Sequence, residues 1–187
     1  MYSTNDFRKG LKIEHNSKPF IIVDYQHVSP GKGSAFVRTK LKNLQTGQVI
    51  EVTYKVGDKV AIPDLENKEM QYLYNDGQTY TFMDLASYDQ VTLTSEELGE
   101  SKYFIVENSV VKVLFYQGKP VSVETENFIE LAVSDTQPNI KGDTSGGGGK
   151  PATMSTGLVV TVPFHISIGD VLKIDTRTSE YVEKIKK

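Results

Sequence analysis

Short runs of β-branched and aromatic residues, bounded by polar turns, recur along most of the chain. Gly, Asn, Asp and Ser residues between these runs supply the turns. Evenly spaced short strands favour small barrels over βαβ units, so the sequence predicts an all-β fold. The predicted strands are Phe20–Tyr25, Ala35–Thr39, Val49–Lys55, Met70–Tyr74, Thr79–Met83, Val110–Tyr116, Pro120–Glu124, Phe128–Val133, Leu158–Val162, Val171–Asp175 and Tyr181–Ile185.

Helix signals are few. Residues 94–99 combine a capping Thr or Ser, two early glutamates and a terminal Gly, which predicts one or two helical turns. A second short helix is predicted over Ser101–Asn108. The similar segments Val56–Val60 and Ile168–Leu172 each predict a tight turn that leads into a strand.

The 187 residues divide most naturally into three modules, residues 1–64, 65–127 and 128–187. The first ends near Pro63-Asp64, and the second ends near Glu126, where an acidic bias stops. Modules of this size bury limited cores and are individually marginal in stability.

The formal net charge of −3 conceals an uneven distribution of charge. Residues 1–64 carry ten Lys/Arg and six Asp/Glu, a net charge of +4. Residues 65–127 carry four and eleven, a net charge of −7, and residues 128–187 carry seven of each. The overall charge argues against a nucleic-acid partner, whereas the basic first module keeps that partner open.

The composition is that of a soluble globular protein, with 38% hydrophobic and 24% charged residues. No apolar run reaches the roughly 18 residues of a membrane span, and Met1–Gly10 is too polar for a secretory signal. The absence of cysteine excludes disulfides, thiolate catalysis and cysteine-bound zinc. We therefore expect a cytoplasmic protein with no membrane partner.

No catalytic or metal-binding motif assembles in the sequence. A nucleotide-binding loop requires a Gly five residues before its Gly-Lys and a Ser or Thr after it. Neither Gly31-Lys32 nor Gly149-Lys150 meets these requirements. The histidines, at positions 15, 27 and 165, lack helical metal-ligand spacing and are expected at the surface or within a barrel. The sequence thus predicts no enzyme activity, no metal and no cofactor.

The segment Ser29–Ser34 places a lysine between two glycines at the tip of a predicted β-hairpin. Gly31 and Gly33 allow backbone conformations that a Cβ would forbid, and they leave no bulk beside Lys32. With Pro30 opening the loop, the hairpin presents one long cation far from the protein body. Such a lysine suits a narrow, negatively charged space, although a solvated turn lysine is the common alternative.

The strand after this loop carries a row of cations. Because strand side chains alternate between faces, Arg38, Lys40 and Lys42 are expected on one face, about 7 Å apart. That spacing approximates consecutive phosphates of a nucleic acid, and Lys55 extends the row. A solvated outer face predicts the same alternation. The aromatic residues Phe36, Tyr25 and Tyr54 are able to stack on bases, but packing in the core is the favoured use of each.

Several ordered motifs match a known family along essentially the whole chain. The hairpin Ser29–Arg38 is the first. The second is the pattern Lys150-Pro151-Ala152, Gly157–Pro163, Ile166 and Gly169, and Gly142-Asp143-Thr144 and Asp175–Thr178 with Tyr181-Val182 are further matches. With these residues the chain resembles the bacterial translation elongation factor P family.

The resemblance implies an N-terminal KOW-type, SH3-like barrel followed by two OB-fold barrels in an L shape similar to tRNA. It implies a monomer that binds the 70S ribosome between the peptidyl and exit sites and stimulates peptide bond formation at polyproline stalls. Lys32 would approach the end of the P-site peptidyl-tRNA, with Pro30, Gly31, Gly33, Arg38, Lys40 and Lys42 contacting tRNA or rRNA. The Gly142-Asp143-Thr144 loop would lie near the E-site mRNA codon on the small subunit.

The resemblance also implies that a lysine-modifying enzyme extends Lys32. A tip lysine disfavours the family branch with a glycosylated arginine, and the Pro30-Gly31 frame resembles the branch with an aminopentanol-type group. A general RNA-binding or ribosome-assembly protein built from barrel modules is the alternative. An enzyme is the third and weakest interpretation.

Overall fold

The computed structural model describes residues 1–138 and 148–186 of the chain. It is all-β, as the sequence predicts, with 55% strand and 7% helix. The chain forms two compact units. Unit 1 comprises Met1–Lys68 and Val113–Ser122, and unit 2 comprises Glu69–Lys112 and Val123–Lys187.

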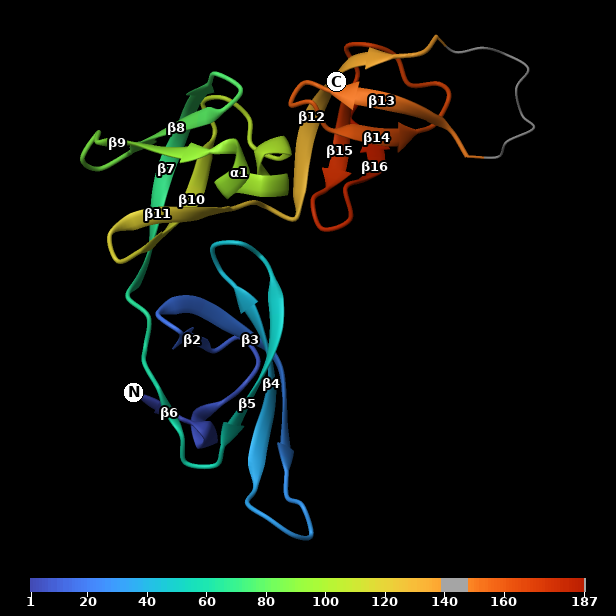
Figure 1. Ribbon diagram of the computed structural model, residues 1–187. Helices are drawn as coiled ribbons and strands as arrows, with labels where there is room; N and C mark the ends of the chain where they lie inside the picture. The colour runs from blue at the N-terminus through green and yellow to red at the C-terminus, as the bar shows by residue number, and fades with distance from the viewer. Residues whose placement is uncertain (139–147, 187) are drawn as a thin grey trace. The chain divides into compact units, whose positions relative to one another are not determined.

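Unit 1 is built around a four-stranded antiparallel sheet in the order β2-β3-β4-β5, with a long β3–β4 hairpin (Figure 1). A two-residue strand at the chain start pairs with a second short strand, and a 3-10 turn, η1, follows the first. The elements are β1 (Tyr2–Ser3), η1 (Thr4–Asp6), β2 (Lys12–His15), β3 (Lys18–Val28), β4 (Phe36–Asn43), β5 (Val49–Lys55) and β6 (Lys59–Val60).

One apolar cluster forms the core of unit 1. Strand β4 contributes Val37 and Leu41 from alternate positions, and its burial alternates over its whole length. The remaining buried members are Phe7, Leu11, Ile13, Phe20, Ile22, Tyr54 and Val60. Burial on one face only is what a half-exposed antiparallel sheet requires, so the other face of β4 is free for polar side chains.

Strand β10 (Val110–Tyr116) ends in a tyrosine that contacts β2 and the turn after it in unit 1. The Tyr116 hydroxyl donates to Glu14 Oε1 at 2.7 Å and lies 3.3 Å from the Ser17 carbonyl oxygen. Burial, together with the Glu14 carboxylate, raises the pKa of Tyr116 to about 12. Leu114 and Val121 pack beside it.

A second sheet has the strand order β11-β10-β7-β8-β9. Its strands are β7 (Leu65–Asn75), β8 (Thr79–Asp84), β9 (Gln90–Thr94), β10 (Val110–Tyr116) and β11 (Lys119–Glu124). The α-helix α1 (Ser95–Leu98) follows β9 and confirms the predicted short helix. Thr94 and Glu97 form a reciprocal capping box at its start, with the Glu97 amide donating to Thr94 Oγ1 at 3.1 Å.

The second predicted helix is only partly right. A 3-10 helix, η2 (Gly99–Tyr103), ends before most of the predicted span, and residues 104–108 are not helical. Phe104 and Ile105 are 7% and 3% exposed, so the chain leaves the helix where two consecutive apolar residues are drawn into the interior. Here tertiary burial overrides local helix propensity.

The third sheet has the order β14-β13-β12-β15-β16 and surrounds the main core of unit 2. Phe104 is the one member of this core from outside residues 128–187, within the described chain. Its strands are β12 (Phe128–Thr136), β13 (Lys150–Met154), β14 (Val159–Val162), β15 (Val171–Asp175) and β16 (Glu180–Lys184).

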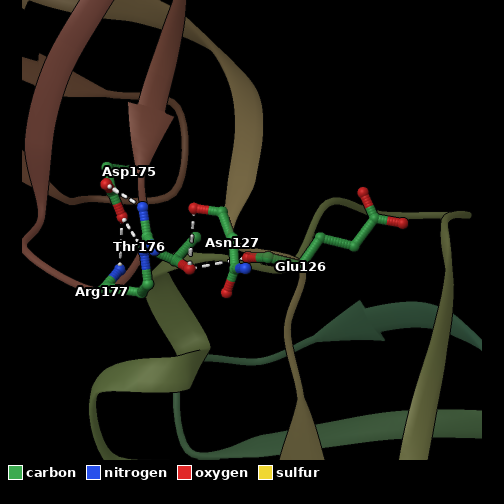
Figure 2. A network of polar contacts seen from close by, with 5 residues as sticks. All are labelled: Glu126, Asn127, Asp175, Thr176 and Arg177. Atoms are coloured by element: carbon green, nitrogen blue, oxygen red, sulfur yellow. Dashed lines mark hydrogen bonds and ion pairs between the residues drawn. The ribbon is translucent and has the colours of Figure 1, made fainter.

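The turn between β15 and β16 holds the segment that precedes β12. The Thr176 hydroxyl donates to the Glu126 carbonyl oxygen at 2.6 Å and lies 3.2 Å from that of Asn127, to which the Thr176 amide also donates at 2.9 Å (Figure 2). Arg177 folds back onto Asp175 in the same turn. These contacts fix the segment before β12 to the turn that follows its neighbouring strand β15.

The two similar segments noted in the sequence form the same turn. In the first, the Lys55 amide donates to the Asp58 carboxylate at 2.8 Å, and the Asp58 amide returns a bond to the Lys55 carbonyl. In the second, Ser167 and Asp170 make the same pair of bonds, the first at 2.9 Å. The Gly before each Asp has a positive φ, which explains the shared Gly-Asp.

Candidate functional site

The β3–β4 hairpin positions the lysine that the sequence singles out. The two strands pair from Phe20 with Asn43 to Val28 with Phe36, and residues 29–35 form the loop between them. Pro30, Lys32 and their glycine neighbours are all exposed. In Figure 1 the loop lies beyond the other strands of this sheet. The predicted lysine-tipped hairpin is confirmed as a structure.

The two tip glycines differ. Gly33 has a φ of +101°, a conformation that side-chain-bearing residues rarely adopt. Gly31 lies outside the positive-φ region, so the prediction of a special backbone is right for Gly33 and wrong for Gly31. A Cβ at either position would meet nothing within 4 Å, so neither glycine is required by packing inside the protein.

The predicted alternation along β4 is confirmed. Arg38, Lys40 and Lys42 are exposed, whereas the residues between them are buried. Lys55 on β5 lies directly opposite Phe36 on β4, so Lys55 lies on the cationic face as predicted. We call this surface, made of Phe36, Arg38, Lys40, Lys42 and Lys55, the outer face of the hairpin sheet.

The middle cation of the outer face lies between two acids. Lys40 pairs with Asp24 on β3 and with Glu51 on β5. Directly opposite residues on antiparallel strands have neighbouring side chains, so an acidic residue lies on each side of Lys40. A β-bulge between Ile22 and Asp24 creates this arrangement, since without it Asp24 would follow Ile22 onto the core side.

Sequence reasoning missed this pairing because it treated β4 alone. A signal was present: the apolar alternation of Phe20 and Ile22 breaks at Asp24 and resumes at Tyr25. Such a break in period indicates a bulge. Asp24 also lies 3.7 Å from Lys9, an exposed pair with little effect on stability.

The three aromatic residues of this region have different environments. Tyr54 belongs to the core, as predicted; burial with nearby Asp58 raises its pKa to about 12, and its hydroxyl lies 3.0 Å from His15 Nδ1. Tyr25 packs against the same core. Phe36 does not: it lies on the outer face, and the Arg38 guanidinium is 5.9 Å from its ring centroid. Core packing was therefore the wrong expectation for Phe36.

The second Gly-Lys pair, Gly149-Lys150, has a structural role. A Cβ on Gly149, whose φ is +118°, would lie 2.3 Å from the Val162 carbonyl oxygen. Lys150 is 4% exposed and donates to the Gln137 carbonyl oxygen at 2.5 Å. Its ammonium group is thus engaged internally, in agreement with the exclusion of a phosphate loop.

Other sequence predictions fall elsewhere in the chain. Gly142, Asp143 and Thr144 lie outside the described residues. His27 and His165 are exposed, as expected for surface histidines. Within residues 1–138 and 148–186, no group of three or more potential ligands is arranged to hold a metal ion. No helix among the same residues is long and apolar enough to cross a membrane.

Family models match three successive segments of the chain. Residues 3–60 match the elongation factor P (EF-P) KOW-like domain, residues 65–123 the EF-P OB domain, and residues 129–184 the elongation factor P C-terminal domain. These assignments agree with the predicted KOW-type and OB folds. Between them the models cover nearly the whole chain.

Curated relatives agree with the family models. Elongation factor P of Pelotomaculum thermopropionicum is 52% identical over 185 residues, covering 99% of this chain and 100% of the relative. Elongation factor P of Bdellovibrio bacteriovorus is 53% identical over 185 residues, covering 99% and 98%. The match extends from end to end in both.

Two solved structures share the fold at lower identity. A eukaryotic translation initiation factor 5A from Methanococcus jannaschii has a TM-score of 0.57 and 21% identity, covering 66% of this chain and 91% of that one. An initiation factor 5A family protein from Naegleria fowleri has a TM-score of 0.51 and 18% identity, covering 66% and 94%. From its three matched domains and its full-length relatives, the chain belongs to the elongation factor P family, whose members are translation factors rather than enzymes.

Proposed function

We propose that this protein binds the ribosome between the P and E sites and stimulates peptide bond formation at polyproline stalls by positioning peptidyl-tRNA. Membership of a translation factor family supports interaction with the ribosome. The observation that carries the finer proposal is Lys32, exposed at the end of the longest hairpin of unit 1 and held there by the positive-φ Gly33. A cation in this position is able to enter a channel lined by phosphates.

The proposed mechanism is positional. Proline is a constrained nucleophile, and consecutive prolines strain the geometry of the peptidyl-tRNA end. A factor that orders this end increases the time that the reacting atoms spend aligned, and orientation supplies up to about 7–11 kcal/mol in favourable cases. Among the described residues, no acidic or basic side chain contacts Lys32. We therefore propose that Lys32 contributes its positive charge and its length, and that it does not transfer a proton.

The remaining contacts follow from this placement. Pro30, Gly31 and Gly33 would let the loop approach RNA closely, and the cations Arg38, Lys40 and Lys42 would meet phosphates of tRNA or rRNA. We place the Gly142-Asp143-Thr144 loop near the E-site codon on the resemblance alone. Extension of Lys32 by a modifying enzyme, a cytoplasmic location, a monomeric state and the module boundaries at residues 64 and 127 belong to the same proposal.

A reconstituted translation reaction tests the function. Purified protein should increase the yield of a reporter with three consecutive prolines and leave a matched reporter with alanines unchanged. Ribosome profiling of a deletion strain should show pauses at polyproline codons. Equal yields of the two reporters with and without the protein would contradict the proposal. In that case a general RNA-binding or ribosome-assembly role would gain support.

A further inference from the structure

The outer face of the hairpin sheet divides into two parts with different chemistry. Lys40 lies between Asp24 and Glu51 on the neighbouring strands, and these acids lower the positive potential around it. Arg38 pairs with Gln26 on one side and Thr53 on the other, and both partners are neutral. The positive potential of the outer face is therefore lowest at Lys40, whereas neither Arg38 near the tip nor Lys42, which pairs with Ile21 and Val49, has an acidic residue directly opposite.

Phe36 occupies the part nearest the tip. It is half-buried, it lies outside the apolar core of unit 1, and its strand partners are Val28 and Lys55. A phenylalanine on the solvent side of a sheet gains less from burial than one in the core. Its ring is instead next to Arg38, whose guanidinium lies 5.9 Å from the ring centroid.

An aromatic ring beside unpaired cations is the combination that single-stranded nucleic acid uses, with bases stacked on rings and phosphates on cations. The Asp58 carboxylate, which follows Lys55 in the next turn, accepts a hydrogen bond from the Lys55 backbone amide at 2.8 Å. The negative charge of a folded acidic protein would complement the cations, but the Phe36 ring would have no defined role in binding that protein. The chemistry thus favours an unpaired nucleotide.

We propose that Phe36 and Arg38 form a stacking platform for one unpaired nucleotide of the RNA that Lys32 approaches, with Lys55 beside it. The base stacks on the Phe36 ring, and the Arg38 guanidinium meets the adjoining phosphate. Lys40 contributes less than Arg38, because two acidic residues, Asp24 and Glu51, lie directly opposite it. This inference rests on the proposed function and narrows it. The hairpin binds RNA through the Phe36 ring and the Arg38 guanidinium near the tip, rather than through equal contacts from every cation of the strand.

The test compares variants of the full-length protein in the reconstituted polyproline reaction, with the factor concentration for half-maximal yield as the readout. Phe36→Leu removes the ring but keeps an apolar side chain, and it should raise that concentration by roughly tenfold. Phe36→Tyr keeps the ring and should restore a value near that of the unaltered protein. Lys40→Ala is the comparison variant: it should raise the value by less than Arg38→Ala does, because Lys40 has Asp24 and Glu51 directly opposite it. Thermal melting establishes that each variant is folded.

Salt dependence separates stacking from charge. The slope of log affinity for ribosomes against log salt should fall by about one for Arg38→Ala, because one phosphate contact is lost. Phe36→Leu should weaken binding with the slope unchanged. If Phe36→Leu matches the unaltered protein, or if Lys40→Ala is as harmful as Arg38→Ala, the platform does not exist. A defect confined to modification of Lys32 in the native host would also overturn it, since the face would then serve a protein partner.

Failure of the proposed function gives a different result. If the unaltered protein does not stimulate polyproline synthesis, the function is wrong whatever the variants do. The ribosome-binding titration then decides the platform by itself: a loss of affinity in Phe36→Leu that Phe36→Tyr restores would support it, and equal affinities would exclude it.

Discussion

Within residues 1–138 and 148–186, an arginine lies beside a phenylalanine ring at two places. In unit 1, Arg38 is 5.9 Å from the Phe36 centroid, and its strand partners are neutral. In unit 2, Arg177 is 5.2 Å from the Phe128 centroid, but its guanidinium also donates to both oxygens of Asp175, at 2.9 and 3.1 Å. The second arginine is part of a closed polar network with the turn around Thr176 (Figure 2).

The difference lies in the neighbouring carboxylate. A bidentate carboxylate satisfies the planar donor fork of arginine and fixes its direction, so Arg177 is a structural residue of the β15–β16 turn. Among the residues that the structure describes, none accepts a hydrogen bond from the Arg38 guanidinium, so its donors are available to a partner. Similar ring–cation pairs thus have different uses, and the predictions below separate the hairpin tip from the β15–β16 turn.

The largest effect is expected from Lys32→Ala. Loss of the tip cation should reduce polyproline synthesis by about tenfold or more, because the alignment of peptidyl-tRNA depends on it. The free energy of unfolding should change by less than about 0.5 kcal/mol, since the side chain is exposed. Arg177→Ala is the matched variant: it should lower the melting temperature and leave polyproline synthesis unchanged. The reverse pattern would contradict the division of roles.

The tip glycines give the next effect. Gly33→Ala forces a side chain into a φ of +101°, at a cost on the order of 1–3 kcal/mol, so the loop should change conformation and lose several-fold in activity. Gly31→Ala has an ordinary φ and open space around it, so the backbone should accept it. If Gly31→Ala reduces activity while the melting temperature is kept, the space beside Lys32 is needed by the bound RNA. Equal effects of both variants on loop NMR shifts would contradict this difference.

Thr176→Val tests the turn in unit 2. It removes the hydroxyl that donates to Glu126 and should destabilise the protein by about 1 kcal/mol. Thr178→Val, at an exposed position of the same turn, is the control and should have little effect. Calorimetry measures both, and polyproline synthesis should be unchanged in each. A turn variant that abolished activity at full stability would show that this turn has a functional contact.

Acid titration gives the smallest effect. Hydrogen bonds from Arg177 hold the pKa of Asp175 below its ordinary value of 3.8. A carboxyl with a lowered folded-state pKa stabilises the fold above about pH 3.8, and this contribution is lost as the pH falls through the lowered value. The Arg177 Nε–H resonance should therefore shift on acidification below pH 3.8, and that of Arg38 should not shift with it. Asp175→Asn should abolish the Arg177 transition, and a transition that persists in this variant would show that Asp175 is not its cause.

Stability measured at alkaline pH tests the hydrogen bond between Tyr116 and Glu14 in the same way. Burial raises the pKa of Tyr116 to about 12. A group with a raised folded-state pKa stabilises the fold at pH values below its ordinary value of 10.0, and this contribution is lost as the pH rises towards 12. Tyr116→Phe should lower stability at neutral pH, because Glu14 loses its partner, and should flatten the decline between these values. An unchanged decline would assign it to other tyrosines.

Most of the long strands could be predicted from local pattern, because alternation and turn residues are properties of neighbouring positions. Strands β5, β10 and β15 have the predicted bounds. Strands that were not predicted include β1, β2, β9 and β13; they are short and contain several polar residues, and β13 contains Pro151. Their identity as strands depends on pairing with a neighbour rather than on their own propensity.

The sequence alone determined the family, the lysine at a hairpin tip and the alternation that exposes Arg38, Lys40 and Lys42, since each is a matter of residue type and local period. Only the tertiary structure decided which of these cations has carboxylate neighbours. That depends on the register between strands distant in sequence, and one bulge at β3 moves Asp24 to the side of Lys40. The expectation of core packing for Phe36 came from its residue type, whereas the period of β4 puts it on the face of Arg38 and the register with β5 sets Lys55 beside it.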